Sequence, residues 1–281
     1  MEVIITCLLI AVSAFLFKVV PPAVERFILY RRQKSYAYCK DFYRGLISLH
    51  IPYFHRLDEE QQHKFLLRTY LFHKSKRFHY VGVQSKPEMP VLISAVAAQL
   101  TLGLEKFTLN YFRNIYVLEH DYHYGDYALP FAGHVDGSGI YLSWDNFLAG
   151  LRYNPDSNHV GLHEMAHALA YVNFVTKTEE DKHFKKEFKN FSKVARPIFQ
   201  EMQKGRKTLL GEYAAVNYHE FWAVSVEMFF ENPVRFKHEL PEIYAAMAIL
   251  LNQDPIEQIK YKRTIVYRQL KAQHASDLAL S

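Results

Sequence analysis

The sequence is poor in cysteine, because its 281 residues include only Cys7 and Cys39. Two cysteines cannot build a disulfide framework or an all-cysteine metal site. Glycine and proline each occur only 11 times and 49% of the residues are hydrophobic, which excludes collagen-like and disordered chains. A strong charge of one sign is also lacking: 34 basic residues oppose 29 acidic ones, so the net charge is 34 − 29 = +5. That excess is too small to indicate a nucleic-acid-binding protein.

One long hydrophobic run lies at the N-terminus, where Val3 to Phe17 are 15 residues without a charge. A membrane-spanning helix takes about 20 apolar residues, and this segment reaches that length if Lys18 extends to the lipid headgroups. The positive charges that follow are at Lys18, Arg26, Arg31, Arg32 and Lys34. The positive-inside rule assigns that side to the cytoplasm. Residues 1–36 are therefore predicted to be a membrane anchor with a juxtamembrane basic segment, which makes the chain a single-pass membrane protein.

Two alternatives to an anchor remain for this segment. A cleaved signal peptide would begin with a positive charge, whereas position 2 holds Glu2. The segment could instead be a buried N-terminal helix, which would make the protein soluble and cytoplasmic. The anchor and the buried helix both leave residues 37–281 as one large domain in the cytoplasm. The low cysteine content agrees with that reducing compartment.

The rest of the chain is predicted to be a helix-rich α+β domain with a small β-sheet. Residues 114–119 and 140–143 have the composition of β-strands, and the segment between them, 121–139, is rich in turn residues and is expected to form loop and hairpin. Helix starts are predicted at Asp58 and at Ser157 or Asn158. Helices are predicted over residues 59–74, 89–102, 144–151, 177–207, 218–231 and 240–251, and the helix that starts after Ser157 or Asn158 is predicted to carry His163 to Ala170.

The most specific motif is an HExxH pattern formed by His163, Glu164 and His167. On a helix, residues four apart project from one face, so both imidazoles can ligate one zinc ion at about 2.0–2.1 Å. Glu164 would lie beside the metal and take a proton from zinc-bound water as a general base. Apolar neighbours indicate a buried helix, where unpaired histidines are costly. The alternative is a pair of core histidines whose polar atoms are satisfied by backbone carbonyls.

A third zinc ligand has to come from elsewhere in the chain. The extended metzincin pattern requires glycine at position 170 and histidine at 173, where this sequence has Ala170 and Asn173. Glu220 and Glu227 are seven residues apart on a predicted helix, so both lie on nearly the same face. A glutamate that faces a core is costly unless it meets a metal or a partner. Spacing does not decide between the two, and His219 is a further candidate.

Several separate segments match, in order, those of a known family. The chain resembles the Mlc titration factor A family of zinc peptidases, also called M90 or glucose-regulated metallopeptidases. Their catalytic core is similar to that of anthrax lethal factor, a gluzincin. The resemblance runs from about Ile51 to about Pro255. The matching segments are IPYFHRLDEEQQ, PEMPVLISAVAAQLTLGL, IYLSWDNFLAGLR, NHVGLHEMAHALA, YAAVNYHEFWAVSVEMFFENP and ELPEIYAAMAILLNQDP.

The resemblance implies roles for individual residues around one Zn²⁺ ion. It selects Glu220 as the third ligand, beside His163 and His167, and leaves Glu227 as a supporting carboxylate. Tyr213 lies seven residues before Glu220 and, by similarity, would donate a hydrogen bond to the oxyanion that forms during hydrolysis. The sequence departs from the family where Trp222 replaces the usual phenylalanine. It also departs after the HExxH motif, where Ala-Leu-Ala stands in place of a Lys-Leu-Asp type continuation.

The resemblance implies a zinc peptidase with aminopeptidase-like action on a peptide or protein substrate. The alternative it implies is a regulatory protein that sequesters a transcriptional repressor, with little turnover. A metal-stabilised structural protein without activity is the third possibility. His120, His123 and His134 lie in the polar loop region and are interpreted as ordinary loop histidines. The alternative is that they border the substrate cleft.

Overall fold

The computed structural model describes residues 31, 34–125, 130–152, 158–176 and 180–259. Nearly all of the predicted membrane anchor, residues 1–30, 32 and 33, lies outside these described residues. Among the described residues, no helix is both long and apolar enough to cross a membrane. The chain divides into two compact units between Tyr43 and Arg44. In the first unit, residues 34–43 are helical, and the second unit contains every element discussed below.

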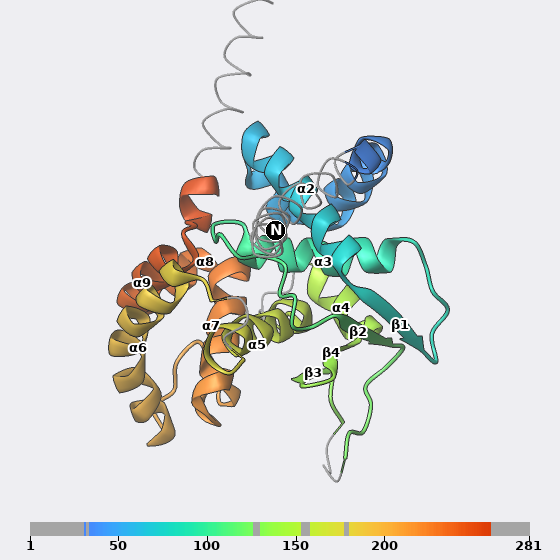
Figure 1. Ribbon diagram of the computed structural model, residues 1–281. Coiled ribbons are helices and arrows are strands. Elements are labelled where there is room, and N and C mark those ends of the chain that lie inside the picture. The colour runs from blue at the N-terminus through green and yellow to red at the C-terminus, as the bar shows by residue number, and fades with distance from the viewer. Residues whose placement is uncertain (1–30, 32–33, 126–129, 153–157, 177–179, 260–281) are drawn as a thin grey trace, which may run out of the picture. The chain divides into compact units, whose positions relative to one another are not determined.

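The second unit is built mainly of helices, with a small sheet to one side of them (Figure 1). The elements in chain order are η1 (Pro52–Arg56), α2 (Glu59–Ser75), β1 (Arg77–Val81), α3 (Glu88–Thr101), β2 (Asn114–Leu118), β3 (Gly133–Asp136), β4 (Gly139–Ser143), α4 (Trp144–Leu151), α5 (Val160–Phe174), α6 (Lys182–Gln203), η2 (Tyr213–Ala215), α7 (Tyr218–Glu231), α8 (Pro233–Glu239) and α9 (Pro241–Leu251). The prediction of a helix-rich α+β domain with a small sheet is therefore confirmed.

Local signals in the sequence fix several element boundaries. Asp58 caps α2 as predicted: its carboxylate accepts the amide of Gln61 at 2.7 Å, and the Gln61 side chain accepts the amide of Asp58 at 3.3 Å. This reciprocal pair satisfies two amides that the first turn of the helix leaves without partners. Helices α4 and α7 begin and end where they were predicted.

Other boundaries differ from the prediction. His159, not Asn158, caps α5, because its imidazole Nδ1 accepts the amide of Leu162 at 3.2 Å; Ser157 lies outside the described residues. Strand β1 and helix α8 were not predicted at all. The five residues of β1 are only partly buried. They form a strand by pairing with β2, and no local sequence pattern predicts that pairing.

The sheet has the strand order β1-β2-β4-β3. Strands β1, β2 and β4 are parallel, whereas β3 forms an antiparallel hairpin with β4 and lies at the edge of the sheet. One face buries Ile115, Val117, Ile140 and Leu142 completely. The opposite face carries a row of stacked rings, with centroids 4.8, 4.4 and 4.2 Å apart, formed in sequence by His79, Tyr116, Tyr141 and His134. This row joins all four strands at one register position and stiffens the edge strand β3.

Helix α5 lies at the centre of the second unit. It packs on α3 and α7 and on strands β3 and β4, and Figure 1 shows the sheet on one side of α5 with α6 and α7 on the other. Every residue of α3 after Glu88 is buried, which makes α3 the middle of the hydrophobic core. The HExxH residues therefore stand on a helix that is held from several sides.

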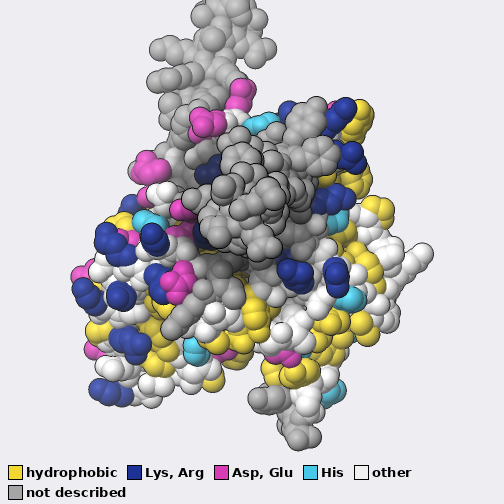
Figure 2. Space-filling model, viewed as in Figure 1, with side chains coloured by type: hydrophobic (Ala, Val, Ile, Leu, Met, Phe, Trp, Pro, Cys, Tyr) yellow, Lys and Arg dark blue, Asp and Glu magenta, His cyan; other side chains and the backbone are white. Residues whose placement is uncertain are grey.

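Helix α6 is strongly amphipathic. Phe184, Phe191 and Phe199 are buried on its inner side, and the first two rings belong to an aromatic cluster with Trp222 of α7. Its outer side carries lysines, and Figure 2 shows basic side chains gathered over the region of this helix. The solvated, charged helix predicted here is thus confirmed between residues 182 and 203, while residues 177–179 lie outside the described part.

Candidate metal centre

The two histidines of the HExxH motif lie one turn apart on α5. Their ring centroids are 4.7 Å apart, and both side chains are only slightly exposed. Each side chain points out of the same face of the helix, as the four-residue spacing requires. The pair is therefore available to bind one shared ligand.

Glu220 reaches these histidines from the first turn of α7. Asn217 fixes the start of that helix, because its side-chain oxygen accepts the amides of His219 at 2.8 Å and of Glu220 at 3.0 Å. The indole N–H of Trp222 donates to the carbonyl of Ala166 at 2.9 Å, inside the HExxH turn. A phenylalanine at position 222 has no such donor. Trp222 thus ties the start of α7 to the motif and holds Glu220 opposite the histidines.

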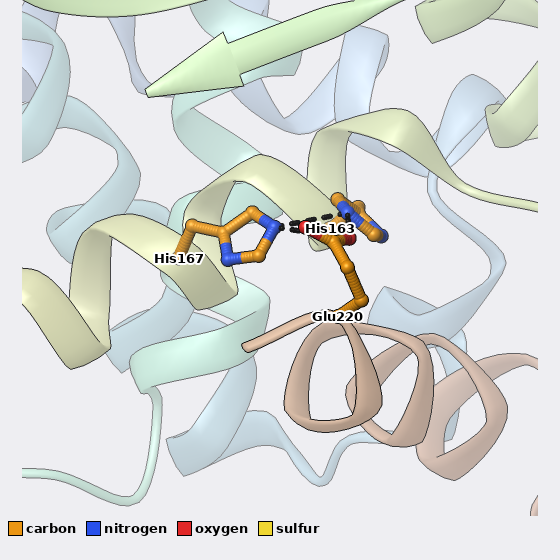
Figure 3. Close-up of side chains that lie close together, drawn as sticks. All are labelled: His163, His167 and Glu220. Carbon is orange, nitrogen blue, oxygen red and sulfur yellow. Dashed lines mark hydrogen bonds and ion pairs between the residues drawn. The ribbon is translucent and has the colours of Figure 1, made fainter. Parts of the chain in front are cut away.

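The three side chains converge on one point, as the close-up in Figure 3 shows. His163 Nε2 lies 2.9 Å from Glu220 Oε2 and 3.0 Å from His167 Nε2, and His167 Nε2 lies 3.5 Å from Glu220 Oε2. Ligand atoms about 2.05 Å from a tetrahedral zinc ion lie about 3.3 Å from each other. The observed separations bracket that value, so this donor set fits a zinc ion. Among the described residues, it is the group of histidine, cysteine and acidic side chains suited to hold a metal.

Glu227 holds His163 from behind. One carboxylate oxygen accepts from His163 Nδ1 at 2.7 Å, and the other accepts the backbone amide of His159 at 2.5 Å. Because a carboxylate only accepts, Nδ1 carries a proton, which leaves Nε2 as the ring nitrogen that a metal ion would bind. Glu227 is 4% exposed and lies on the far side of the ring, so it orients the imidazole of His163 and is not one of the three converging side chains.

Glu164 lies beside the three converging side chains and is 4% exposed. Its Oε2 atom is buried and has no hydrogen-bond partner among the described residues. Edge strand β3 passes directly over this side chain: a Cβ atom added to Gly133 would lie 2.7 Å from Glu164 Cγ and 2.8 Å from Oε1. The absence of a side chain at Gly133 therefore allows the strand to approach and confine the carboxylate.

The pKa values of the clustered side chains show that their environment favours a bound positive charge. Burial opposes a charge on His163, but hydrogen bonds to Glu220 and Glu227 outweigh it and raise the pKa of His163 to about 10. Burial, reinforced by the charges of Glu220 and Glu227, raises the pKa of Glu164 to about 8. Burial also opposes the charge on Glu220, yet hydrogen bonds from His163 and His167 hold its pKa well below the usual range. Two buried carboxylates and the half-buried Glu220 around two imidazoles are the surroundings that a divalent cation would compensate.

The cluster opens into a cleft of about 740 Å³. Tyr213 lies at its rim, with its ring centroid 6.0 Å from that of His163 and 59% of its surface exposed. Burial of its hydroxyl and the nearby charge of Glu220 raise the pKa of Tyr213 above its ordinary value, so this residue stays a hydrogen-bond donor. The remaining wall of the cleft is largely aromatic and comes from β3, α5, α6 and α7.

The other histidines singled out in the sequence lie apart from the cluster. His120 is exposed and pairs with Asp145 at 2.7 Å, and His123 is exposed as well. His134, by contrast, lines the cleft, and its Nδ1 atom lies 2.7 Å from the hydroxyl of Tyr122. His219 also lines the cleft, but it is not one of the three converging side chains.

Several residues at this site were not identified from the sequence. Gly133 confines Glu164, and Arg196 of α6 lines the cleft from the other side. Both approach the cluster only through tertiary packing, about 30 residues away from the motif on either side. Neither residue type is rare enough to be noticed in a sequence pattern.

Comparisons with known proteins agree with this geometry. A family model described as "Glucose-regulated metallo-peptidase M90" matches residues 28–250. An uncharacterized protein of Synechocystis sp. is 23% identical over 226 residues, which cover 73% of this chain and 81% of that protein. The family match confirms the M90 resemblance drawn from the sequence motifs. Membership of a metallopeptidase family implies a bound metal, commonly zinc.

Proposed function

The chain belongs to the M90 family of glucose-regulated metallopeptidases, and from this premise we propose that it is a zinc-dependent peptidase. One observation carries the proposal: the imidazoles of His163 and His167 and the carboxylate of Glu220 converge at 2.9–3.5 Å beside the buried, unpartnered oxygen of Glu164. Three protein ligands and an open fourth position are the arrangement that catalytic zinc sites use.

In this proposal His163, His167 and Glu220 hold one Zn²⁺ ion. A zinc ion there would supply Lewis-acid polarisation of a peptide carbonyl and acidification of a water molecule. Glu164 takes a proton from the attacking water and delivers it to the leaving amine, which its confinement under β3 favours. Tyr213 donates a hydrogen bond to the negative charge that develops on the peptide oxygen.

The open edge of β3 supports peptides as the substrate class. Among the described residues, the only pairing on that edge is an isolated bridge between Phe131 and Tyr122, and Gly133 to Val135 line the cleft. An extended peptide can add to such an edge through backbone hydrogen bonds. The resemblance implies aminopeptidase-like action, and we include that mode in the proposal. Peptides with a free and with an acetylated N-terminus test it, because an aminopeptidase requires the free amine.

Variants of the metal ligands test the zinc site. His163→Ala is expected to lose zinc and peptide hydrolysis together. Glu220→Gln is expected to bind zinc far more weakly than Glu227→Gln, since Glu227 reaches His163 at Nδ1, on the side away from the converging side chains. If changing Glu227 removes the metal while changing Glu220 leaves it bound, the ligand assignment is wrong. Metal content after dialysis measures both outcomes.

The regulatory alternative makes a different prediction. A protein that sequesters a transcriptional repressor would keep its effect on gene expression when Glu164 is replaced by glutamine, because binding does not need the general base. A peptidase whose physiological role depends on turnover would lose it. Comparing Glu164→Gln with the wild type in cells that lack the protein therefore separates the two functions.

We also propose that the chain is anchored in a membrane with its peptidase domain in the cytoplasm; the alternative is a soluble cytoplasmic protein. The uncharged residues 3–17, followed by five basic residues, support the anchor. Extraction of cell membranes at alkaline pH tests it: an anchored chain stays with the lipid, and deletion of residues 1–20 releases it. Release of the intact chain under these conditions would contradict the anchor.

A further inference from the structure

Arg196 is a cation in the wall of the cleft without an anionic partner among the described residues. It lies on α6, is exposed, and its guanidinium carbon lies 4.6 Å above the ring of Tyr218. Stacking on an aromatic ring fixes the guanidinium without neutralising its charge. Two other basic residues of the same helix do have carboxylate partners: Lys185 pairs with Glu180 at 2.7 Å and Lys186 with Glu187 at 3.0 Å. The charge of Arg196 is thus left facing the cleft.

The carboxylates of the cleft are already engaged. Among the described residues that line it, only Glu164 and Glu220 are acidic, and both belong to the proposed metal centre. A positively charged group of a ligand therefore finds no spare carboxylate on this wall, whereas a negatively charged group finds Arg196. The charge pattern selects for an anion at the α6 side of the cleft.

The guanidinium of Arg196 favours a planar anion. Phe174 and Phe188, whose ring centroids are 4.8 Å apart, form an apolar wall of the same cleft. This wall carries no charged group that would compete with Arg196 for an anion. The fork of N–H groups on a guanidinium matches the two oxygens of a carboxylate. Peptides carry such groups at the C-terminus and on aspartate and glutamate side chains.

We propose that Arg196 binds a carboxylate of the peptide substrate and thereby selects acidic or C-terminally free peptides. The inference rests on the proposed peptidase function and specifies its substrate class. Strand β3 and helix α6 lie on opposite sides of α5 (Figure 1). Gly133 to Val135 of β3 and Arg196 of α6 line the same cleft, so a peptide held along β3 would lie in the cleft that Arg196 faces.

The test compares matched peptides on the full-length, zinc-loaded chain. One pair is Ala-Ala-Phe-Ala-Ala with a free C-terminus and the same peptide as an amide. A second set places a single glutamate, or the matching glutamine, at each position of the amide. The wild type is expected to prefer the carboxylate member of at least one pair by about tenfold in kcat/KM, the size of one charge-assisted contact. A preference within the first pair shows that Arg196 binds the C-terminal carboxylate, and a preference within the second set shows that it binds a glutamate side chain.

Two variants assign the preference to Arg196. Arg196→Met keeps an apolar stem over Tyr218 and removes the charge, so it is expected to hydrolyse both members of a pair at the rate of the uncharged one. Lys193→Met removes a charge of the same helix that does not line the cleft, and it is expected to keep the preference. The inference would be overturned if the wild type hydrolysed both members of every pair with equal kcat/KM. It would also be overturned if the preference for the carboxylate member persisted in Arg196→Met.

A binding measurement separates this inference from the proposed function. The same peptides, each with one alanine replaced by a lysine that carries a fluorophore, are titrated into Glu164→Gln and into the double variant Glu164→Gln with Arg196→Met. Fluorescence anisotropy then gives Kd without turnover. The carboxylate peptide is expected to bind the double variant about tenfold more weakly, while its uncharged match binds both alike. Absence of hydrolysis by the wild type would refute the peptidase proposal, whereas unchanged Kd values would refute the role of Arg196.

Discussion

Replacing Gly133 by alanine tests whether β3 positions Glu164. The added Cβ would lie 2.7 Å from Glu164 Cγ, 2.8 Å from Oε1 and 3.0 Å from Cδ. Carbon atoms pack at about 3.5–4.0 Å, so the overlap is on the order of 1 Å. Since β3 is held to β4 along its whole length, we expect the Glu164 side chain to move by about that distance. A displacement of 1 Å in a catalytic group lowers a rate by about 100-fold.

The three atoms nearest to this Cβ all belong to Glu164, and none belongs to a ligand of the proposed metal centre. Gly133→Ala is therefore expected to bind zinc as the wild type does while its kcat/KM falls by about 100-fold. Overpacking of this size would also lower the free energy of unfolding by about 1–3 kcal/mol. Metal content, peptide hydrolysis and thermal unfolding of the same preparations give the three values.

A matched control is available four residues away. Gly137 lies in the turn between β3 and β4, and a Cβ there would meet nothing nearer than the Tyr111 hydroxyl at 3.7 Å. Gly137→Ala is expected to keep wild-type activity. If Gly133→Ala is as active as Gly137→Ala, β3 does not confine Glu164. If Gly133→Ala instead loses zinc in proportion to activity, the substitution acts through the ligands and the reasoning is also wrong.

Three further changes test other contacts of the site. Glu227→Gln leaves one N–H of His159 or His163 facing an amide N–H, so zinc affinity measured against a competing chelator should fall 10- to 100-fold; unchanged affinity would exclude an orienting role. Trp222→Phe loses the bond to Ala166 and leaves a cavity, so urea unfolding should show a loss of about 1–3 kcal/mol, and wild-type stability would refute this tie between α5 and α7. Burial lowers the pKa of His159 to about 4, below its ordinary value of 6.5. As the pH falls from about 6.5 to 4, His159 is therefore protonated in the unfolded chain before it is protonated in the folded one, and the metal-free protein loses stability. The loss attributable to His159 is up to about 3 kcal/mol and should vanish in His159→Asn, which keeps a helix cap; equal pH profiles for the two proteins would contradict it.

Much of the fold could be predicted from local patterns. The capping residues of α2, Asp58 and Gln61, lie only three positions apart in the sequence, and the unbroken segments that form α3 and α7 are long enough to identify a helix. Strand β1 could not be predicted, because its exposed and half-buried residues alternate weakly and only its parallel pairing with β2 makes it a strand. His159 was not recognised as a cap, because histidine is a rare capping residue and acts here through Nδ1.

The candidate site could likewise be predicted only in part from the sequence. His163 and His167 could be paired from their spacing alone, since a helix brings residues four apart together. The choice between Glu220 and Glu227 could not be made from spacing, because seven residues return to the same helix face. Tertiary packing separates the two carboxylates, with Glu220 on the Nε2 side of His163 and Glu227 on the Nδ1 side. Gly133 and Arg196 act from other elements and left no signal in the sequence near the motif.

The most direct test of the central claim is metal content together with peptide hydrolysis, measured for the full-length wild type and Glu164→Gln side by side. Because Glu164 lies beside the three ligands without being one of them, both proteins are expected to retain one zinc ion per chain. Only the wild type should hydrolyse peptides, and chelation should abolish that activity until zinc is restored. A Glu164→Gln protein that cleaves peptides as fast as the wild type, or a wild type that binds no zinc, would contradict a zinc peptidase with Glu164 as its general base.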